Sequence, residues 1–317
     1  MFSARDLTIQ QLRCFVAVAD EGQFTAAADE LNVAQPSISA QINRLEHVLG
    51  VTLFHRGRRP IALTDAGQQL VPLARRVLAG IDDVFGEAEN LEGLRRGHVT
   101  IGTTPSIGAT LLPPLLAAFR RRYPGVAVSF VERHSREIVT ALEMGSLDLA
   151  LMVGPIAHPN LAISTLAHEH LIVIVGRDHP LAAQPSVRLS DLVSVPLIYF
   201  HEGYDVRATT ESAFTTAGLR PNVALEGAEI GTVHAFVAAG LGAAIVPGLV
   251  AAMSDDVVAL DLVDPTIERT VCVAYDQRHS LSRAATALLE AVRDETLNGD
   301  WVARAPGLRI VVPPPGG

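Results

Sequence analysis

The strongest constraint on the fold is a pair of helical segments within residues 7–50 that have almost no chain between them. Apolar residues recur at helical spacing in three stretches, 12–19, 24–31 and 38–49. Only residues 32–34 connect the second stretch to the third, and Pro36 suits a first helical turn because its missing N–H is not needed there. So short a connection between two helices predicts a helix-turn-helix motif.

The outer face of the third helical segment follows from its apolar stripe. At about 100° per residue, the side chains that point most nearly away from the core are those of Pro36, Ala40, Asn43 and His47. This face, with Ser37, Ser39 and Arg44 beside it, is polar and short in reach, which suits a helix lying against base edges in a major groove. The alternative is an ordinary solvated helix face.

Two short apolar stretches, 51–54 and 61–63, flank a segment rich in arginine and predict a small hairpin, or wing. The formal net charge of the chain is −9, yet no acidic residue occurs between His47 and Thr64. We expect the arginines of the wing to pair with phosphates or to enter a minor groove, with a solvated run of charges as the alternative. They are Arg56, Arg58 and Arg59.

A long helix is predicted from a cap at Thr64 to about Leu94, with a kink at Pro72. Its apolar residues are spaced alternately by four and three positions: Leu70, Ala74, Val77, Ile81, Val84, Ala88 and Leu91. Such a heptad pattern is typical of a coiled coil and predicts that this helix pairs with a second copy of itself. Packing on the rest of its own chain is the alternative.

Residues 98–296 alternate between strand-like and helix-like segments, which predicts an α/β body with a mostly parallel sheet. We expect two lobes, the first from residues 98–167 and 269–296 and the second from residues 168–268. The expected organisation is a DNA-binding domain over 1–64, a linker helix and hinge over 65–97, the α/β body over 98–296, and a loose tail over 297–317.

Ligands of open α/β sheets bind beyond the carboxyl ends of the strands. This rule nominates candidate ligand contacts, which are Thr103, Thr104, Ser106, His134, Ser135, Phe200, His201 and Glu229. Plain capping and turn chemistry is the alternative for each of them. Two histidines, His168 and His170, share a strand face, but two ligands without a third do not predict a metal site.

Composition excludes several classes of chemistry. All 25 basic residues are arginine, so a P-loop lysine and a Schiff-base lysine are both absent. No G-x-S-x-G or dinucleotide-binding motif occurs, and the two cysteines, Cys14 and Cys272, predict inert thiols. Without a long apolar run or a signal peptide, a cytoplasmic location is expected and a membrane partner is not. The alternative to a DNA-binding protein is an α/β enzyme or a solute-binding protein with an N-terminal regulatory region.

Five short runs within residues 15–67 together resemble the LysR-type transcriptional regulators. They are FVAVA at 15–19, FTAAA at 24–28, QPSIS at 35–39, GVTLF at 50–54 and LTDAG at 63–67. The resemblance extends more weakly to residues 99–106, 145–150 and 237–247. It departs from the family at Ala34, where serine commonly caps the helix, and at Ala40, where some members place a basic residue.

The resemblance implies a winged helix-turn-helix, a dimerising linker helix and a two-lobed α/β effector domain like the periplasmic binding proteins. It further implies a dimer of dimers (a homotetramer) on two adjacent sites of double-stranded DNA, an unidentified small-molecule effector and no cofactor. RNA polymerase is a further candidate partner, and enzymatic activity is not expected. The DNA-contacting residues would be Gln35, Pro36, Ser37, Ser39, Arg44, Arg56 and Arg58.

Overall fold

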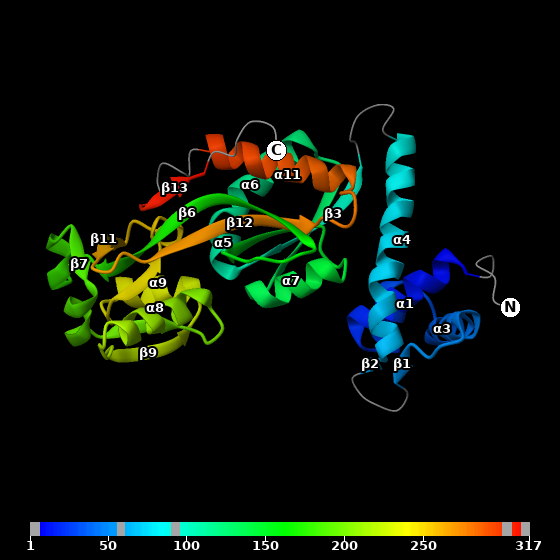
Figure 1. Ribbon diagram of the computed structural model, residues 1–317, viewed down its shortest axis with the longest axis horizontal. Helices are drawn as coiled ribbons and strands as arrows, with labels where there is room; N and C mark the ends of the chain where they lie inside the picture. Colours follow the sequence, from blue (N-terminus) through cyan, green and yellow to red (C-terminus); the bar gives the residue numbers. More distant parts are fainter. Residues whose placement is uncertain (1–6, 56–60, 90–95, 300–305, 312–317) are drawn as a thin grey trace. The chain divides into compact units, whose positions relative to one another are not determined.

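The computed structural model describes residues 7–55, 61–89, 96–299 and 306–311. The chain forms two compact units (Figure 1). The first contains the residues up to Gly97, and the second contains most of the residues from His98 onward. Among the described residues, no helix combines the length and the apolar character that crossing a bilayer requires.

The first unit is built on three helices, α1 (Ile9–Glu21), α2 (Phe24–Glu30) and α3 (Gln35–Leu49). The side chain of Thr8 caps α1 in a reciprocal capping box with Gln11. Two alanines, Ala27 and Ala28, are buried on α2, where small side chains let neighbouring helices approach closely. The observed helices confirm the predicted helix-turn-helix.

A two-stranded hairpin follows, in which β1 (Phe54–His55) pairs antiparallel with β2 (Ala62–Leu63). These strands are the base of the predicted wing, whereas its arginine-rich tip, residues 56–60, lies outside the described residues. Gly67 packs so tightly here that a Cβ on it would come within 2.2 Å of the Leu53 carbonyl oxygen. Glycine is therefore required where the next helix crosses the hairpin.

Helix α4 (Asp65–Glu89) begins where predicted, because the Thr64 hydroxyl accepts a hydrogen bond from the Gly67 N–H at 3.0 Å. It continues through Pro72. The first two residues of the predicted heptad pattern pack into the first unit: Leu70 is half-buried and Ala74 is buried. The surface beyond them is apolar, with Val77 48% and Val84 69% exposed. Leu91 and the side chain of Ala88 lie outside the described part of the chain.

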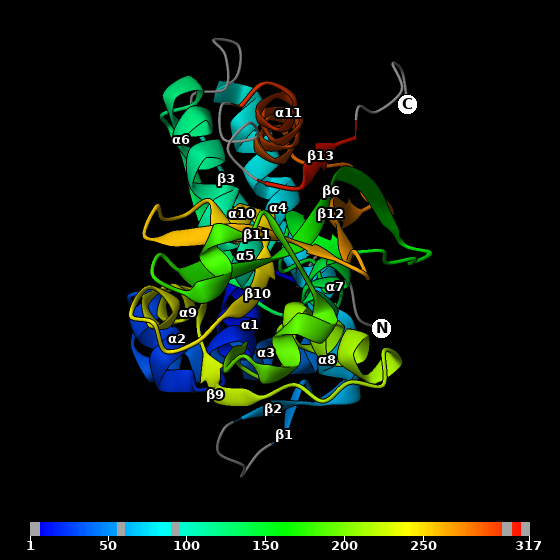
Figure 2. The same ribbon diagram turned by 90° about the vertical axis from the view of Figure 1, so that its left-hand side faces the viewer.

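The second unit is an α/β body whose elements follow one another in chain order. They are β3 (Gly97–Thr103), α5 (Pro105–Thr110), α6 (Leu112–Arg122), β4 (Val126–Glu132), α7 (Ser135–Glu143), β5 (Leu149–Gly154), β6 (Leu161–Gly176), η3 (Pro180–Ala183), β7 (Ser186–Arg188), η4 (Leu189–Ser194), β8 (Leu197–Phe200), α8 (Asp205–Thr216), β9 (Val223–Ala228), α9 (Ile230–Ala238), β10 (Ala244–Pro247), α10 (Gly248–Ala251), β11 (Val257–Val263), β12 (Glu268–Asp276), α11 (Arg283–Asn298) and β13 (Leu308–Ile310). Helices α6 and α11 lie side by side on one face of the first lobe (Figures 1 and 2).

The main sheet has the strand order β4-β3-β5-β12-β6-β11-β7, with β10 and β13 also paired to β6. Strand β6 is 16 residues long, and it pairs with β12 in the first lobe and with β10 and β11 in the second. Only the second half of β6, from Leu171 onward, is continuously apolar. The chain passes from the first lobe to the second on β6 and returns on β12.

The expectation of a mostly parallel sheet is wrong for the centre of this body. Strand β12 is antiparallel to both β5 and β6, and β6 is antiparallel to β10 and β11. The physical reason is the double crossing, because two strands that carry the chain in opposite directions between the lobes must run antiparallel when they pair. Parallel pairing is found between β3 and β5, β8 and β9, and β7 and β11.

The C-terminal part was expected to be a loose tail from residue 297, and this is wrong for residues 308–310. They form β13, which pairs antiparallel with β6 opposite residues 167–169 (Figure 2). The hydrogen bond from His170 N–H to the Gly307 carbonyl, at 3.0 Å, extends this pairing. The alternating Leu308 and Ile310 are half-buried while Arg309 is exposed, which is the pattern of an edge strand.

Candidate functional site

The first candidate site is the outer face of α3. Its inner face buries Ile38, Ile42 and Leu45 completely or nearly so. On the opposite side the exposed residues are Gln35, Pro36, Ser37, Ala40, Asn43, Arg44 and His47, with Ser39 half-buried. The Gln35 amide donates a hydrogen bond to the Ser39 hydroxyl at 2.9 Å, one turn away. The structure therefore brings five of the nominated DNA-contacting residues onto one helix surface.

The position of α3 is fixed from its other end by Glu46. Its carboxylate accepts a hydrogen bond from the backbone N–H of Leu53 at 2.7 Å. Because Leu53 is fully buried and immediately precedes β1, this bond ties the orientation of α3 to the base of the wing. Spacing alone did not predict this contact, since it joins a helix side chain to the backbone of the following loop.

The start of α3 lacks a side-chain cap, because Ala34 precedes it in an extended conformation with φ −71° and ψ 138°. Serine adopts this conformation readily, so Ala34→Ser will raise the free energy of unfolding of the first unit by about 1 kcal/mol. Urea unfolding monitored by circular dichroism checks this. The control Ala40→Ser places the same hydroxyl inside the helix and will not stabilise. An equal gain from both substitutions would contradict the capping explanation.

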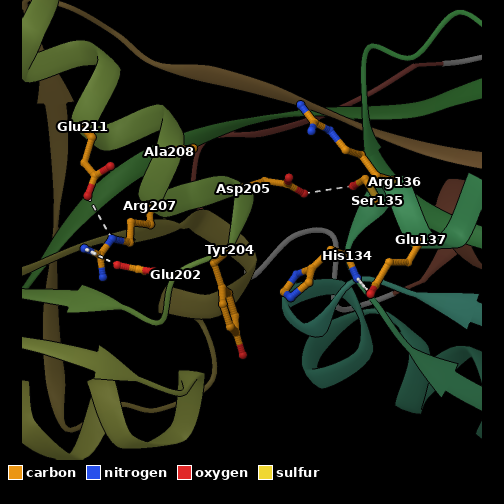
Figure 3. Close-up of a pocket in the computed structure, with 11 residues that line it drawn as sticks. His134, Ser135, Arg136, Glu137, Glu202, Tyr204, Asp205, Arg207, Ala208 and Glu211 are labelled. Carbon is orange, nitrogen blue, oxygen red and sulfur yellow. Dashed lines mark hydrogen bonds and ion pairs between the residues drawn. The ribbon is translucent and has the colours of Figure 1, made fainter.

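The second candidate site is a cavity of about 560 Å³ between the two lobes of the second unit (Figure 3). Residues at the start of α7 line one wall, and residues at the start of α8 line the other. The Ser135 hydroxyl donates a hydrogen bond to the Asp205 carboxylate at 2.9 Å across this cavity. Both residues are the first of their helices, so each is held rigidly by its own lobe.

The two walls of this cavity also meet in an aromatic contact between the lobes. The rings of His134 and Tyr204 meet edge to face with centroids 6.2 Å apart, and Phe200 stacks on Tyr204 at 5.4 Å. Gly203 has φ +97°, and a Cβ on it would come within 2.9 Å of His134 Nε2. A glycine is therefore required for the lobes to come this close at His134.

A buried ion pair joins the two crossing strands. Arg269 on β12 lies opposite Glu169 on β6, with Nε 2.7 Å from Oε2, and both side chains are buried. The other oxygen of Glu169 accepts a hydrogen bond from the Leu249 N–H of α10 at 2.6 Å. Arg269 Nη1 donates to the Ser106 hydroxyl of α5 at 2.9 Å. One network thus connects α5 of the first lobe with α10 of the second.

Carboxylates from both lobes approach each other near Tyr204. The Tyr204 hydroxyl donates a hydrogen bond to Glu229, and burial and this carboxylate both raise the pKa of Tyr204. Burial raises the pKa of Glu132, and the neighbouring charge of Glu229 raises it further. The protonated form of Glu132 is therefore favoured relative to a free glutamate.

The structure distributes the nominated effector residues over these features. His134 and Ser135 line the cavity, Phe200 is buried beneath Tyr204, and Glu229 bonds to Tyr204. Thr103, Thr104 and Ser106 are buried at the start of α5, and the exposed His201 ring contacts the Glu202 carbonyl oxygen. Sequence reasoning missed Tyr204 and Asp205, which lie just beyond the nominated loop. It also missed Glu169 and Arg269, which are 100 positions apart in sequence.

The histidines and cysteines form no further centre in the described part of the chain. His168 and His170 flank the Glu268 carboxylate at 3.2 and 3.6 Å. Among the described residues, no group of three or more histidine, cysteine, aspartate or glutamate side chains has the arrangement of a metal site. Cys14 and Cys272 are free and buried, and burial raises the pKa of both thiols.

The chain is similar to proteins of one family along most of its length. Residues 9–68 match the description "Bacterial regulatory helix-turn-helix protein, lysR family", and residues 92–297 match "LysR substrate binding domain". A Bacillus subtilis (strain 168) protein described as the uncharacterized HTH-type transcriptional regulator YybE is 32% identical over 286 residues, which are 89% of this chain and 97% of that protein.

Solved structures of full-length regulators have the same architecture. The LysR family transcriptional regulator CbnR, complexed with its target DNA, aligns with a TM-score of 0.62 and 28% identity over 90% of this chain and 99% of that one. A full-length OxyR variant from Pseudomonas aeruginosa shares the fold with a TM-score of 0.74 and 24% identity, covering 94% and 97% of the two chains. The chain therefore belongs to the LysR family of DNA-binding transcriptional regulators.

Proposed function

We propose that this regulator reads DNA with α3 and grips the backbone with its wing. Gln35, Pro36, Ser37, Ser39 and Arg44 would face the major groove, and Arg56 and Arg58 would contact phosphates or the minor groove. The exposed polar face of α3, opposite a fully buried apolar face, supports the first assignment. The acid-free sequence around the wing supports the second.

The substitutions Arg56→Ala and Arg58→Ala will weaken binding to all duplex sequences and will flatten the dependence of affinity on salt. Removing one phosphate contact lowers the slope of log K against log salt by about one. Mobility-shift titrations on the DNA upstream of the regulator's own gene, at several salt concentrations, measure this slope. Arg220→Ala removes an equal charge from an exposed position of the second unit and serves as the control. An unchanged slope in the wing variants would show that these arginines do not contact the DNA phosphates.

The function that the geometry of the second unit supports best is effector-controlled transcription, with a small molecule bound between the lobes. The observation that carries this is the hydrogen bond between Ser135 and Asp205, because it joins two rigid helix starts across an open cavity. A ligand there would bias the closure of the lobes, and closure would alter the spacing of the DNA-binding units in the assembly.

Thermal unfolding of the full-length protein against a metabolite library tests effector binding. A compound present at 100 times its dissociation constant stabilises a protein by about 2.7 kcal/mol. We expect at least one compound that raises the melting temperature and also changes the mobility shift of the DNA complex. A library without any such compound would count against effector control. Effector binding as proposed here requires no cofactor. We also propose that the regulator acts in the cytoplasm.

The assembly is proposed to be a dimer through α4, and a dimer of dimers when two adjacent sites are occupied. Exposed apolar residues spaced as in a heptad support the first interface: Leu73, Val77 and Val84. Gly80 falls between them in the same pattern, and a Cβ added to it would meet no atom of another residue within 4 Å. RNA polymerase is proposed as the partner through which the bound assembly acts on transcription.

A further inference from the structure

We propose that residues 306–311 form a strap that holds the two lobes of the second unit at one angle and must detach before the lobes can rotate. This strap contains β13 and lies beyond residues 92–297, the part of the chain that matches the LysR substrate binding domain. The inference goes beyond the proposed function, because it concerns the mechanics of the hinge whether or not an effector binds between the lobes.

The strap runs along β6, on which the chain crosses from one lobe to the other (Figures 1 and 2). Its strand β13 pairs antiparallel with residues 167–169 of β6. Two further backbone hydrogen bonds extend this pairing. The His170 N–H donates to the Gly307 carbonyl oxygen at 3.0 Å, and the Val311 N–H donates to the Leu166 carbonyl oxygen at 2.9 Å. The strap is thus bonded to β6 near both of its ends.

The strap makes the hinge three strands wide at this point. On the other edge of β6, residues 268–271 of β12 lie opposite residues 167–170. Because β6 and β12 both carry the chain between the lobes, a rotation of one lobe against the other must bend or twist this pair. A third paired strand opposes that movement, since β13 has to follow the deformation or lose its backbone hydrogen bonds.

The start of the strap is wedged against the second lobe. Strand β10 pairs with β6 as far as Pro247, which lies opposite Leu171, and β13 begins opposite Glu169. Gly248, the first residue of α10, packs so closely on the strap that a Cβ on it would come within 1.8 Å of the Pro306 carbonyl oxygen. The strap therefore contacts both lobes, and a rotation that moves α10 relative to β6 has to displace Pro306.

Glu268 connects the strap to the second crossing strand. One oxygen of this carboxylate on β12 lies 3.2 Å from Nη2 of Arg309 on β13 and 3.6 Å from Nε2 of His170 on β6. All three side chains are at least 39% exposed, so these contacts hold the strap only weakly. A strand of three residues held in this way can detach while the rest of the domain stays folded.

Distances between spin labels on the two lobes test this proposal without any effector, so its failure is distinct from a failure of effector control. Arg121→Cys on α6 and Arg220→Cys in the second lobe replace exposed residues, whereas the two native cysteines are buried. Labelled protein is diluted into unlabelled protein, so that distances within one chain dominate. A chain that ends at residue 305 should give a distance distribution about twofold broader than the full chain. A chain that ends at residue 311 keeps the strap and should match the full chain.

Gly248→Ala displaces the strap in the full-length chain and maintains the test if the shortened chain does not fold. Its methyl group would overlap the Pro306 carbonyl oxygen, so the distance distribution should broaden as it does in the chain that ends at residue 305. Gly231→Ala is the matched control, because a Cβ there would meet no atom of another residue within 4 Å. Adding Gly248→Ala to the shortened chain should have no further effect, since the clashing oxygen is gone.

Hydrogen exchange measured by mass spectrometry shows whether the strap has detached. In the Gly248→Ala variant, the amide of His170 should exchange about tenfold faster than in the unsubstituted chain. The adjacent amide of Leu171 donates to the Ile267 carbonyl oxygen at 2.8 Å and should exchange as before. Unchanged exchange at His170 would contradict the wedged contact. Lobe distances that stay the same once the strap is released or removed would overturn the proposal, as would equal broadening by Gly248→Ala with and without the strap.

Discussion

Replacing Arg269 by methionine will lower the free energy of unfolding of the second unit by about 3–5 kcal/mol. The substitution leaves the carboxylate of Glu169, which is fully buried, with only the Leu249 N–H as a hydrogen-bond donor among the described residues. An unpaired buried charge is among the most destabilising changes that a single substitution can make. Equilibrium unfolding in urea, followed by circular dichroism, measures this decrease.

The double variant Glu169→Met and Arg269→Met distinguishes charge from packing. Replacing both members of a buried pair with apolar side chains of similar volume is often neutral or stabilising, so the double variant should recover most of the stability. Arg309→Met is the control at the surface, because Arg309 is exposed and pairs with Glu268 at 3.2 Å. It should cost less than about 1 kcal/mol. If Arg269→Met and Arg309→Met lower the free energy of unfolding by the same amount, the buried ion pair does not hold β6 and β12 together.

The elements that could be predicted from the sequence are those fixed by local periodicity. The apolar spacing in α2 and α3 predicted which faces are buried, and the outer face of α3 follows from it by geometry alone. In α1 the spacing was less informative, because Cys14 is buried while Val16 and Ala19 are only half-buried. The start of α4 was equally predictable, since the Thr64 hydroxyl accepts a hydrogen bond from the N–H of Gly67, three residues later. Long-range pairing left no such local signal. Strand β6 runs from one lobe into the other, and only its second half is continuously apolar.

The candidate effector site likewise has some features that the sequence predicted and others that depend on long-range packing. The rule for strand ends located the loops that hold His134, Ser135 and Thr104, because each directly follows a strand. It could not reveal which side chains meet across the lobes, such as Ser135 with Asp205. Nor could it reveal that the Thr104 hydroxyl lacks an acceptor among the described residues, which depends on the positions of all of its neighbours. These facts come from tertiary packing, for which the strand-end rule has no information.

The heptad pattern of α4 was predicted from spacing, but one part of it is buried in the first unit and another part is exposed. Ala74 is buried in the core of the first unit, so it is not available to a second copy of the chain. Leu73, Val77 and Val84 are 47, 48 and 69% exposed, and with Gly80 they maintain alternating steps of four and three. The exposed series therefore has Leu73 and Gly80 in place of the predicted Ala74 and Ile81.

The double substitution Val77→Glu and Val84→Glu will dissociate the proposed α4 dimer and lower the affinity for a two-site operator by about 10²–10⁴-fold. Two glutamates from each helix would be buried against one another, and without the dimer the second DNA-binding unit loses the effective concentration that the first provides. Sedimentation equilibrium measures the dissociation, and mobility shift measures the affinity. The control Met253→Glu with Leu297→Glu adds the same charge at exposed apolar positions of the second unit. A dimer that survives at Val77 and Val84 but fails in the control would move the interface from α4 to the effector domain.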